Sequence, residues 1–307
     1  MNRVATYNQF ISSTAGIATG QANMAKAQEQ ASSQKVAGDL QGFGIEVGRL
    51  LSAKSYAERL DRRAETLKAL EARADVEATA LESAQAAVKQ ARDGLANAAA
   101  NQNGVGLKAA LEQALSIIGT AANVQYNGEA IFGGEWGYGE PFVPASLDTL
   151  AAQANTDANW VDTGRNRTVM IEDNRSIELS RNAKDLFRPF VDLLRSIRVW
   201  ENTNGALTGR LTAAQLTYVQ GLIPQMATVQ STLIDKSAEA GSTAQQIEMA
   251  VTTNDAKRDT LLATIGDQEN VNLAEVAARL SAAQTQYQAS AAIFGQLKDL
   301  SLLQYLR

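Results

Sequence analysis

Apolar residues recur at seven-residue intervals through two long parts of the sequence. The first repeat consists of Leu60, Leu67, Ala74, Leu81, Val88 and Leu95. The second consists of Val219, Met226, Leu233, Ala240, Ile247 and Leu261, with Asn254 at the position between the last two. A seven-residue apolar repeat is typical of a helix that packs lengthwise against another helix. The pattern therefore predicts two long helices, each with one buried stripe.

A third repeat lies near the C-terminal end of the sequence. Its positions are Leu273, Val276, Leu280, Ala283, Tyr287, Phe294 and Leu297. Asn272, followed three residues later by Glu275, resembles the capping box at the start of a helix. The small side chain of Ala283 within the stripe predicts a partner that approaches closely. We predict that these seven residues form an assembly seam between subunits, with packing inside one chain as the alternative.

The first part of the sequence, residues 1–44, shows no comparable apolar repeat. Small and polar side chains dominate it, and large apolar residues such as Ile11 and Met24 are sparse. A cluster of glycines at its end interrupts any helix. Because such a segment buries little apolar surface by itself, we expect an arm that is disordered in the monomer.

Residues 129–185 have a different composition, rich in glycine and holding two prolines and two of the three tryptophans. RTVMIE and SIELS each alternate apolar and polar residues, as strands do. Asp173 and Asn174 lie between these two segments and suit a tight turn. The pattern therefore predicts a small β-rich insertion with a hairpin. Helix is expected to resume near residue 185, with Pro189 in its first turn, where a missing N–H is tolerated.

Together these patterns predict a mainly α fold. It has long antiparallel helices with heptad seams, terminal coiled-coil arms and a small β-rich insertion. The expected parts are an N-terminal arm at 1–44, a helical core at 45–128 and 186–265, the insertion at 129–185, and a C-terminal coiled-coil arm at 266–307.

The composition narrows the possible chemistry. The chain has neither cysteine nor histidine, so the usual zinc ligands, thiolate nucleophiles and the common general base near neutral pH are missing. The chain has 28 basic and 33 acidic residues, which give a net charge of −5. A nucleic-acid-binding protein carries a cluster of basic residues, and the sequence shows no such cluster. We expect no enzyme activity, no cofactor, no metal and no nucleic-acid partner.

The sequence also lacks the long apolar run of a membrane-spanning helix. Its N-terminal residues do not combine a charged region with an apolar core, so we expect no cleavable secretory signal and no membrane insertion. If the protein leaves the cell, another export route is required.

Four segments resemble the flagellin superfamily. ASSQKVAGDLQGFG is similar to the Ser-Ser-Gly-Lys stretch of that family, with Gln34 in place of the usual glycine. VQYNGEAIFGG and SIELSRNAKDLF are similar to the segments that leave and re-enter the helical part. The segment from Val271 to Arg307 resembles the C-terminal arm, and its ending LSLLQYLR is closer to the hook-associated members than to filament flagellin.

The resemblance implies a structural adaptor between the flagellar hook and the filament, located outside the cell. It implies self-assembly into a ring, a second hook-associated protein and filament flagellin as neighbours, and passage unfolded through the flagellar type III export apparatus with a chaperone. It also implies arms that become a coiled coil on assembly. A short filament flagellin is the alternative, followed by a non-flagellar helical scaffold or a secreted effector.

Overall fold

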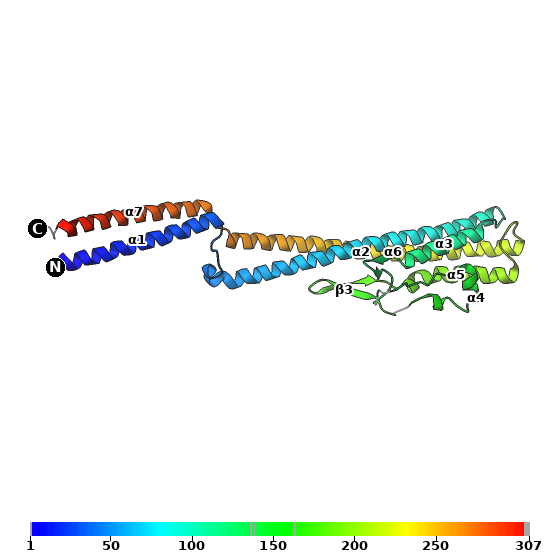
Figure 1. Ribbon diagram of the computed structural model, residues 1–307. Coiled ribbons are helices and arrows are strands. Elements are labelled where there is room, and N and C mark those ends of the chain that lie inside the picture. Colours follow the sequence, from blue (N-terminus) through cyan, green and yellow to red (C-terminus); the bar gives the residue numbers. More distant parts are fainter. Residues whose placement is uncertain (1, 136, 138, 162–163, 304–307) are drawn as a thin grey trace. The chain divides into compact units, whose positions relative to one another are not determined.

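The computed structural model describes residues 2–135, 137, 139–161 and 164–303 (Figure 1). The chain forms two compact units. One consists of Met1–Asp61 with Asp255–Arg307, and the other of Arg62–Asn254. We call them the terminal unit and the central unit. Two long helices, α2 (Val47–Ala100) and α6 (Ala213–Glu269), contribute residues to both.

The terminal unit contains α1 (Asn2–Ser33), the short 3-10 helix η1 (Gln41–Glu46) and α7 (Leu273–Leu303), together with the start of α2 and the end of α6. Figure 1 shows α1 and α7 side by side and antiparallel. The glycines at the end of the N-terminal segment do interrupt the helix, because α1 ends at Ser33 and α2 begins only at Val47. α2 and α6 share a small apolar cluster here, made by Leu50, Ala57 and Ile265.

The central unit is a bundle in which α3 (Leu107–Ala122) and α5 (Ala183–Asn204) join α2 and α6. Most of the heptad positions predicted from the sequence lie in its buried apolar clusters. Fully buried members include Leu81, Val88, Leu95, Val219 and Met226. The predicted long helices with heptad seams are therefore confirmed. A hydrogen bond of 2.8 Å from Arg92 to Gln230 also joins α2 to α6.

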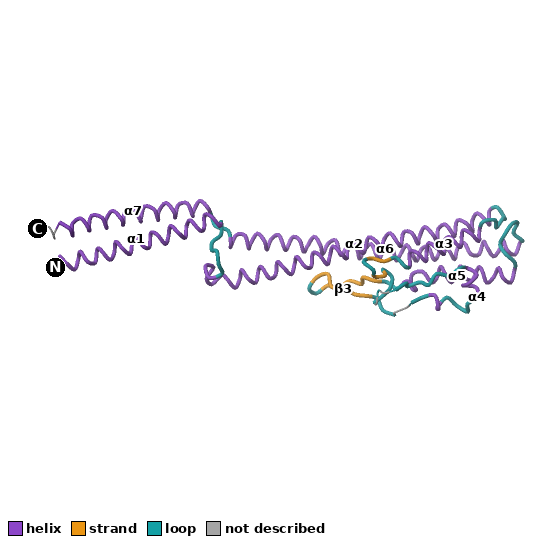
Figure 2. Tube along the Cα trace, viewed as in Figure 1, coloured by secondary structure: helices purple, strands orange, loops and turns teal. Residues whose placement is uncertain are grey.

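The insertion combines two small sheets with short helices (Figure 2). β1 (Gln125–Tyr126) pairs with β2 (Glu129–Ala130), and β3 (Arg167–Glu172) pairs with β4 (Arg175–Ser180), both antiparallel. The predicted hairpin with its turn at residues 173–174 is thus confirmed. Two helical turns that the sequence pattern did not predict lie between the sheets, α4 (Leu147–Ala152) and η2 (Asp157–Asn159).

The β3–β4 hairpin is fastened to the bundle by apolar packing and by charge. Ile171, Ile177 and Leu179 form a cluster with residues of α2 and α6. Next to the hairpin, Arg181 pairs with the buried carboxylate of Glu77 on α2 at 2.7 Å. Burial raises the pKa of Glu77, and the adjacent Arg181 opposes that rise. The insertion therefore belongs structurally to the central unit.

Pro189 lies one turn later in its helix than predicted. α5 begins at Ala183, where the side chain of Asn182 accepts a hydrogen bond of 3.1 Å from the Lys184 N–H. This N-cap starts the helix earlier than the apolar pattern indicates. Pro189 consequently lies inside α5, where its ring removes one helical hydrogen bond.

Candidate assembly surface

The C-terminal stripe predicted from the sequence faces α1 along most of its described length. Val276 and Ala283 are buried, whereas Leu280, Tyr287 and Phe294 are half-buried. The rings of Phe294 and Phe10 lie 5.1 Å apart, centre to centre. Leu273, at the start of α7, remains 49% exposed. The side chain of Leu297 lies outside the described residues.

The two terminal helices approach closely because α1 presents small residues to α7. A Cβ atom added at Gly16 would lie 2.7 Å from the hydroxyl of Ser290. One added at Gly20 would lie 3.2 Å from the Cα of Tyr287, which is closer than Cβ atoms ordinarily pack. The Ser290 hydroxyl can rotate away from a methyl group at Gly16, but the backbone of Tyr287 cannot, so a side chain at Gly20 would push the helices apart.

Sequence reasoning missed the α1 half of this seam. Ser13, Gly20 and Ala27 are buried and lie seven residues apart, so a heptad repeat is present. The repeat is not evident in the sequence because it is built from small residues, which give little apolar signal. Most of the segment expected to be disordered in the monomer is helical here, as α1. Whether this arm is disordered in the isolated monomer stays a prediction.

Two connecting segments meet next to this helix pair. The Val36 N–H donates to the carbonyl of Glu269 at 2.8 Å, and the Val271 N–H donates to the carbonyl of Gln34 at 3.1 Å. The α1–η1 and α6–α7 connections are thus held together by backbone hydrogen bonds. We call this arrangement the joint.

A single carboxylate reinforces the joint. Glu269 pairs with Lys54 of α2 and with Lys35, whose ammonium lies 3.0 Å away. Hydrogen bonds from Lys54 and Lys35 hold the pKa of Glu269 below its ordinary value. A carboxylate whose pKa is lowered by folding adds stability above its unfolded pKa, and that stability is lost as pH falls through the lowered value.

Acidification is therefore expected to loosen the joint. As pH falls below the ordinary glutamate pKa of about 4.3, hydrogen-exchange protection of the Val36 and Val271 amides should decrease, after correction for intrinsic exchange. Glu269→Gln should show reduced protection already at neutral pH and little further pH dependence. Equal protection in Glu269→Gln and the wild type at neutral pH would show that this carboxylate does not stabilise the joint.

Gln34 adopts a left-handed backbone conformation at the end of α1, with φ of +57°. This conformation costs an L-residue roughly 1–2 kcal/mol, whereas glycine adopts it freely. Glycine is the residue at this position in the Ser-Ser-Gly-Lys stretch of the flagellin superfamily, which this segment resembles. Gln34→Gly is expected to stabilise the helix end by about 0.5–1 kcal/mol, after the greater freedom of glycine in the unfolded chain is subtracted. Hydrogen exchange of the last α1 turn measures this gain.

The control is the same substitution at an exposed helical position. Gln28 lies within α1, where glycine lowers stability by roughly 1 kcal/mol or less. Gln34→Gly is expected to increase the hydrogen-exchange protection of α1, and Gln28→Gly is expected to decrease it. A loss of protection in both variants would contradict the backbone argument.

Large apolar side chains remain exposed on the helix pair. Phe10, Ile11, Leu273 and Ile293 are each between 43% and 51% exposed. Phe10 packs one side of its ring against Phe294, but about half of each of these side chains stays open to solvent in the single chain. Exposed apolar groups that gather on one part of a protein are typical of sites that pack against other proteins.

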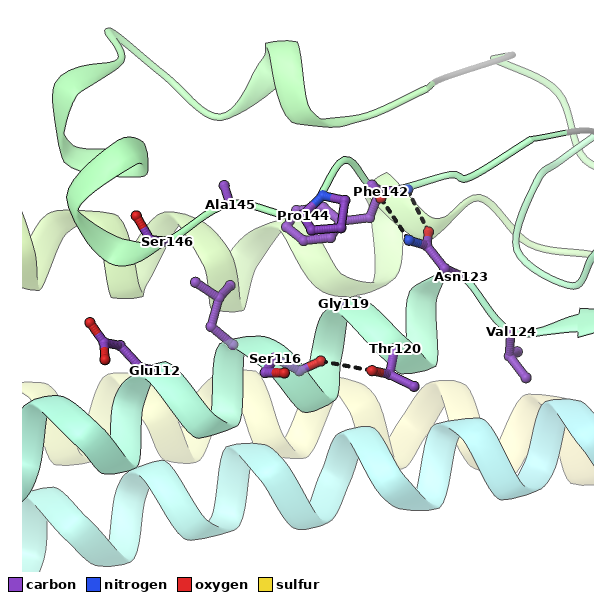
Figure 3. A pocket seen from close by; sticks show the side chains of 11 residues that line it. Glu112, Ser116, Gly119, Thr120, Asn123, Val124, Phe142, Pro144, Ala145 and Ser146 are labelled. Carbon is purple, nitrogen blue, oxygen red and sulfur yellow. Dashed lines mark hydrogen bonds between the residues drawn. The ribbon is translucent and has the colours of Figure 1, made fainter.

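The pocket beside α3 offers little for catalysis. It has a volume of about 840 Å³ and lies between α3 and the segment that contains Phe142 and Pro144 (Figure 3). Asn123 holds that segment in place, since its side chain donates to the Phe142 carbonyl at 2.7 Å and accepts from the Phe142 N–H at 2.8 Å. Among the described residues that line the pocket, only Glu112 is ionisable.

The part of the chain that the structure describes offers neither a metal site nor a membrane span. It contains no group of three or more carboxylates arranged to hold a metal ion. None of its helices is both long and apolar enough to cross a membrane.

Comparison with known proteins gives one family match and several structural matches. Residues 216–306 match the bacterial flagellin C-terminal helical region. A structure from Vibrio parahaemolyticus described as a flagellar hook-associated protein has a TM-score of 0.59 and 14% identity, covering 76% of this chain and 99% of that chain. The structure of FlgL from Bacillus cereus has a TM-score of 0.53 and 16% identity, and the match covers 70% of this chain and 98% of that chain. No curated protein sequence matches significantly.

At these identities the structural likeness establishes the fold, and the match at residues 216–306 establishes the kinship of the C-terminal helices. Both agree with the helix pair and the heptad seams described above. The chain therefore carries a C-terminal helical region of the bacterial flagellin type at residues 216–306, and its fold is that of the two solved structures.

Proposed function

We propose that this protein is the adaptor that joins the flagellar hook to the filament, the role of hook-associated protein 3. The observation that carries the proposal is the fold, which is shared over most of the chain with two structures described as hook-associated proteins or FlgL. The sequence ending LSLLQYLR supports the same role, because it resembles those members more than filament flagellin.

The terminal helices are the assembly elements in this proposal, with Leu273, Val276, Leu280, Ala283, Tyr287, Phe294 and Leu297 as the seam. The pair of helices is held largely by small residues such as Gly20 and Ala283, which bury little apolar area. We infer that the arms become fully ordered only when neighbouring subunits cover the exposed groups. Limited proteolysis of the isolated chain should then leave a core of roughly residues 45–265.

The proposed neighbours are further copies of this chain in a ring, a second hook-associated protein and filament flagellin. The proposed export route is the flagellar type III apparatus, with a chaperone that binds the chain before export. A strain with a blocked export apparatus should retain the protein inside the cell.

Deletion of the gene tests the adaptor role. Cells should carry hooks without filaments and should release unassembled filament protein into the medium, and the wild-type gene should restore filaments. Bare hooks with no filament protein in the medium would instead identify the chain as a short filament flagellin. Normal filaments in the deletion strain would contradict both roles.

A further inference from the structure

The chain contains three Asn-Gly dipeptides, at residues 103–104, 127–128 and 204–205. Asparagine is thermolabile because its side-chain amide can be attacked by the backbone nitrogen of the next residue. Glycine at that next position favours the attack, since it has no Cβ to restrict the approach. The three dipeptides share this intrinsic reactivity, so their structural surroundings determine which of them reacts in the folded protein.

The dipeptide at 103–104 is restrained at both reacting groups. The Gly104 N–H donates to the carbonyl of Gly209 at 2.8 Å, and the side-chain oxygen of Asn103 accepts from the Val105 N–H at 2.9 Å. A Cβ at Gly104 would lie 2.2 Å from the Leu207 carbonyl oxygen, so the backbone here is also closely packed. The amide nitrogen cannot turn toward the side chain without breaking these contacts.

The dipeptide at 204–205 ends α5 and is restrained in a similar way. The Gly205 N–H donates to the carbonyl of Glu201 at 2.9 Å. The side-chain nitrogen of Asn204 donates to the carbonyl of Trp200 at 3.0 Å. Attack would require the last turn of the helix to open.

The dipeptide at 127–128 differs from both. It forms the two-residue turn between β1 and β2, with φ of +51° at Asn127 and +80° at Gly128. Both residues are exposed, and among the described residues neither the Asn127 side chain nor the Gly128 N–H has a hydrogen-bond partner. Each strand has only two residues, and a ladder that short opens readily.

We propose that Asn127 is a site of spontaneous deamidation in the folded protein. The Gly128 nitrogen loses its proton to hydroxide and bonds to the side-chain carbonyl carbon of Asn127. The carbon–nitrogen bond of the side-chain amide breaks, and ammonia leaves with a proton from water. Water then opens the resulting succinimide at either carbonyl, which leaves aspartate or isoaspartate at position 127.

The modification changes the turn in two ways. Either product adds a negative charge two residues from Glu129, whose carboxylate pairs with Arg167 at 2.7 Å. Isoaspartate also lengthens the backbone by one carbon atom within a turn whose two-residue length sets the pairing of β1 with β2. The modified chain is therefore expected to lose part of this small ladder.

Peptide mapping by mass spectrometry tests the proposal on the purified full chain, aged at mildly alkaline pH and physiological temperature. In the folded chain, Asn127 should convert about tenfold or more faster than Asn103 and Asn204, the factor expected when an intact hydrogen bond must break first. In denaturant the three rates should become similar, because only the shared dipeptide chemistry remains. Isoaspartyl methyltransferase labelling should report the isoaspartate product.

Asn127→Gly serves as the matched control, since glycine also adopts the left-handed turn and cannot deamidate. This variant should lose the product at position 127 and leave the rates at Asn103 and Asn204 unchanged. The proposal is overturned if Asn103 or Asn204 reacts as fast as Asn127 in the folded chain, or if folding does not change the ratio of the three rates.

Discussion

Gly20→Leu in α1 is expected to abolish filament attachment and swimming. Even a Cβ atom at this position would lie 3.2 Å from both the Cα and the Cβ of Tyr287, and backbone atoms cannot move aside as a flexible side chain can. The leucine must therefore separate α1 from α7. Leucine also has a higher helix propensity than glycine, so any loss would come from packing and not from a weaker α1 helix.

The predicted defect is confined to the terminal unit. Melting of the central unit, Arg62–Asn254, should be unchanged, because its core residues lie within that range. Motility assays and electron microscopy measure the loss of swimming and of filament attachment. Calorimetry of the purified chain measures the melting of the central unit. Ala22→Leu adds the same side chain at an exposed position of α1 and should preserve the helix pair. Normal swimming of Gly20→Leu would show that close packing of α1 with α7 is not required.

Glu77→Ala is expected to lower the free energy of unfolding of the central unit by about 3–5 kcal/mol, the usual result of removing one partner of a buried ion pair. The Glu77 carboxylate is buried and pairs with Arg181 at 2.7 Å. Arg73, which is also buried, donates to the Ile131 carbonyl at 3.0 Å and lies close enough for its charge to favour that of Glu77. Without Glu77, two guanidinium groups lose their nearest buried counter-charge.

The matched control is Glu82→Ala, the same substitution at an exposed position of the same helix. It should change stability by roughly 0.5 kcal/mol or less. Chemical denaturation followed by circular dichroism measures both variants. If Glu77→Ala and Glu82→Ala are equally stable, the Arg181 contact does not fasten the insertion to the bundle.

The sequence pattern predicted the long helices well because their seams consist of large apolar residues. Leu81, Val88 and Leu95 recur at one spacing, and burying that stripe requires another helix beside it. The β3–β4 hairpin was equally predictable, since alternation and turn chemistry are both local. The buried charge was not predicted, because Glu77 lies seven residues after Leu70 and seven before Ala84, on a face where the heptad pattern indicates only apolar packing.

The candidate assembly surface was predicted only in part. The α7 stripe was found from its large residues, but its partner on α1 uses Ser13, Gly20 and Ala27, which carry little apolar signal. The left-handed conformation of Gln34 could not be predicted from the sequence, because glutamine rarely adopts a positive φ. The contacts of Lys35 and Lys54 with Glu269 join residues far apart in the chain, and no local pattern reports such pairs.

The position of this protein in the flagellum is the most direct test of the account. The chain has no cysteine, so one introduced at an exposed residue is a unique chemical label. Val105 and Met170 are 76% and 63% exposed, and Val105→Cys and Met170→Cys can be made in separate strains that are first checked for normal swimming. Gold attached to these thiols and imaged on isolated hooks with filaments should mark one narrow band where the hook meets the filament. Gold along the whole filament, or no gold at the junction in either strain, would contradict the adaptor role.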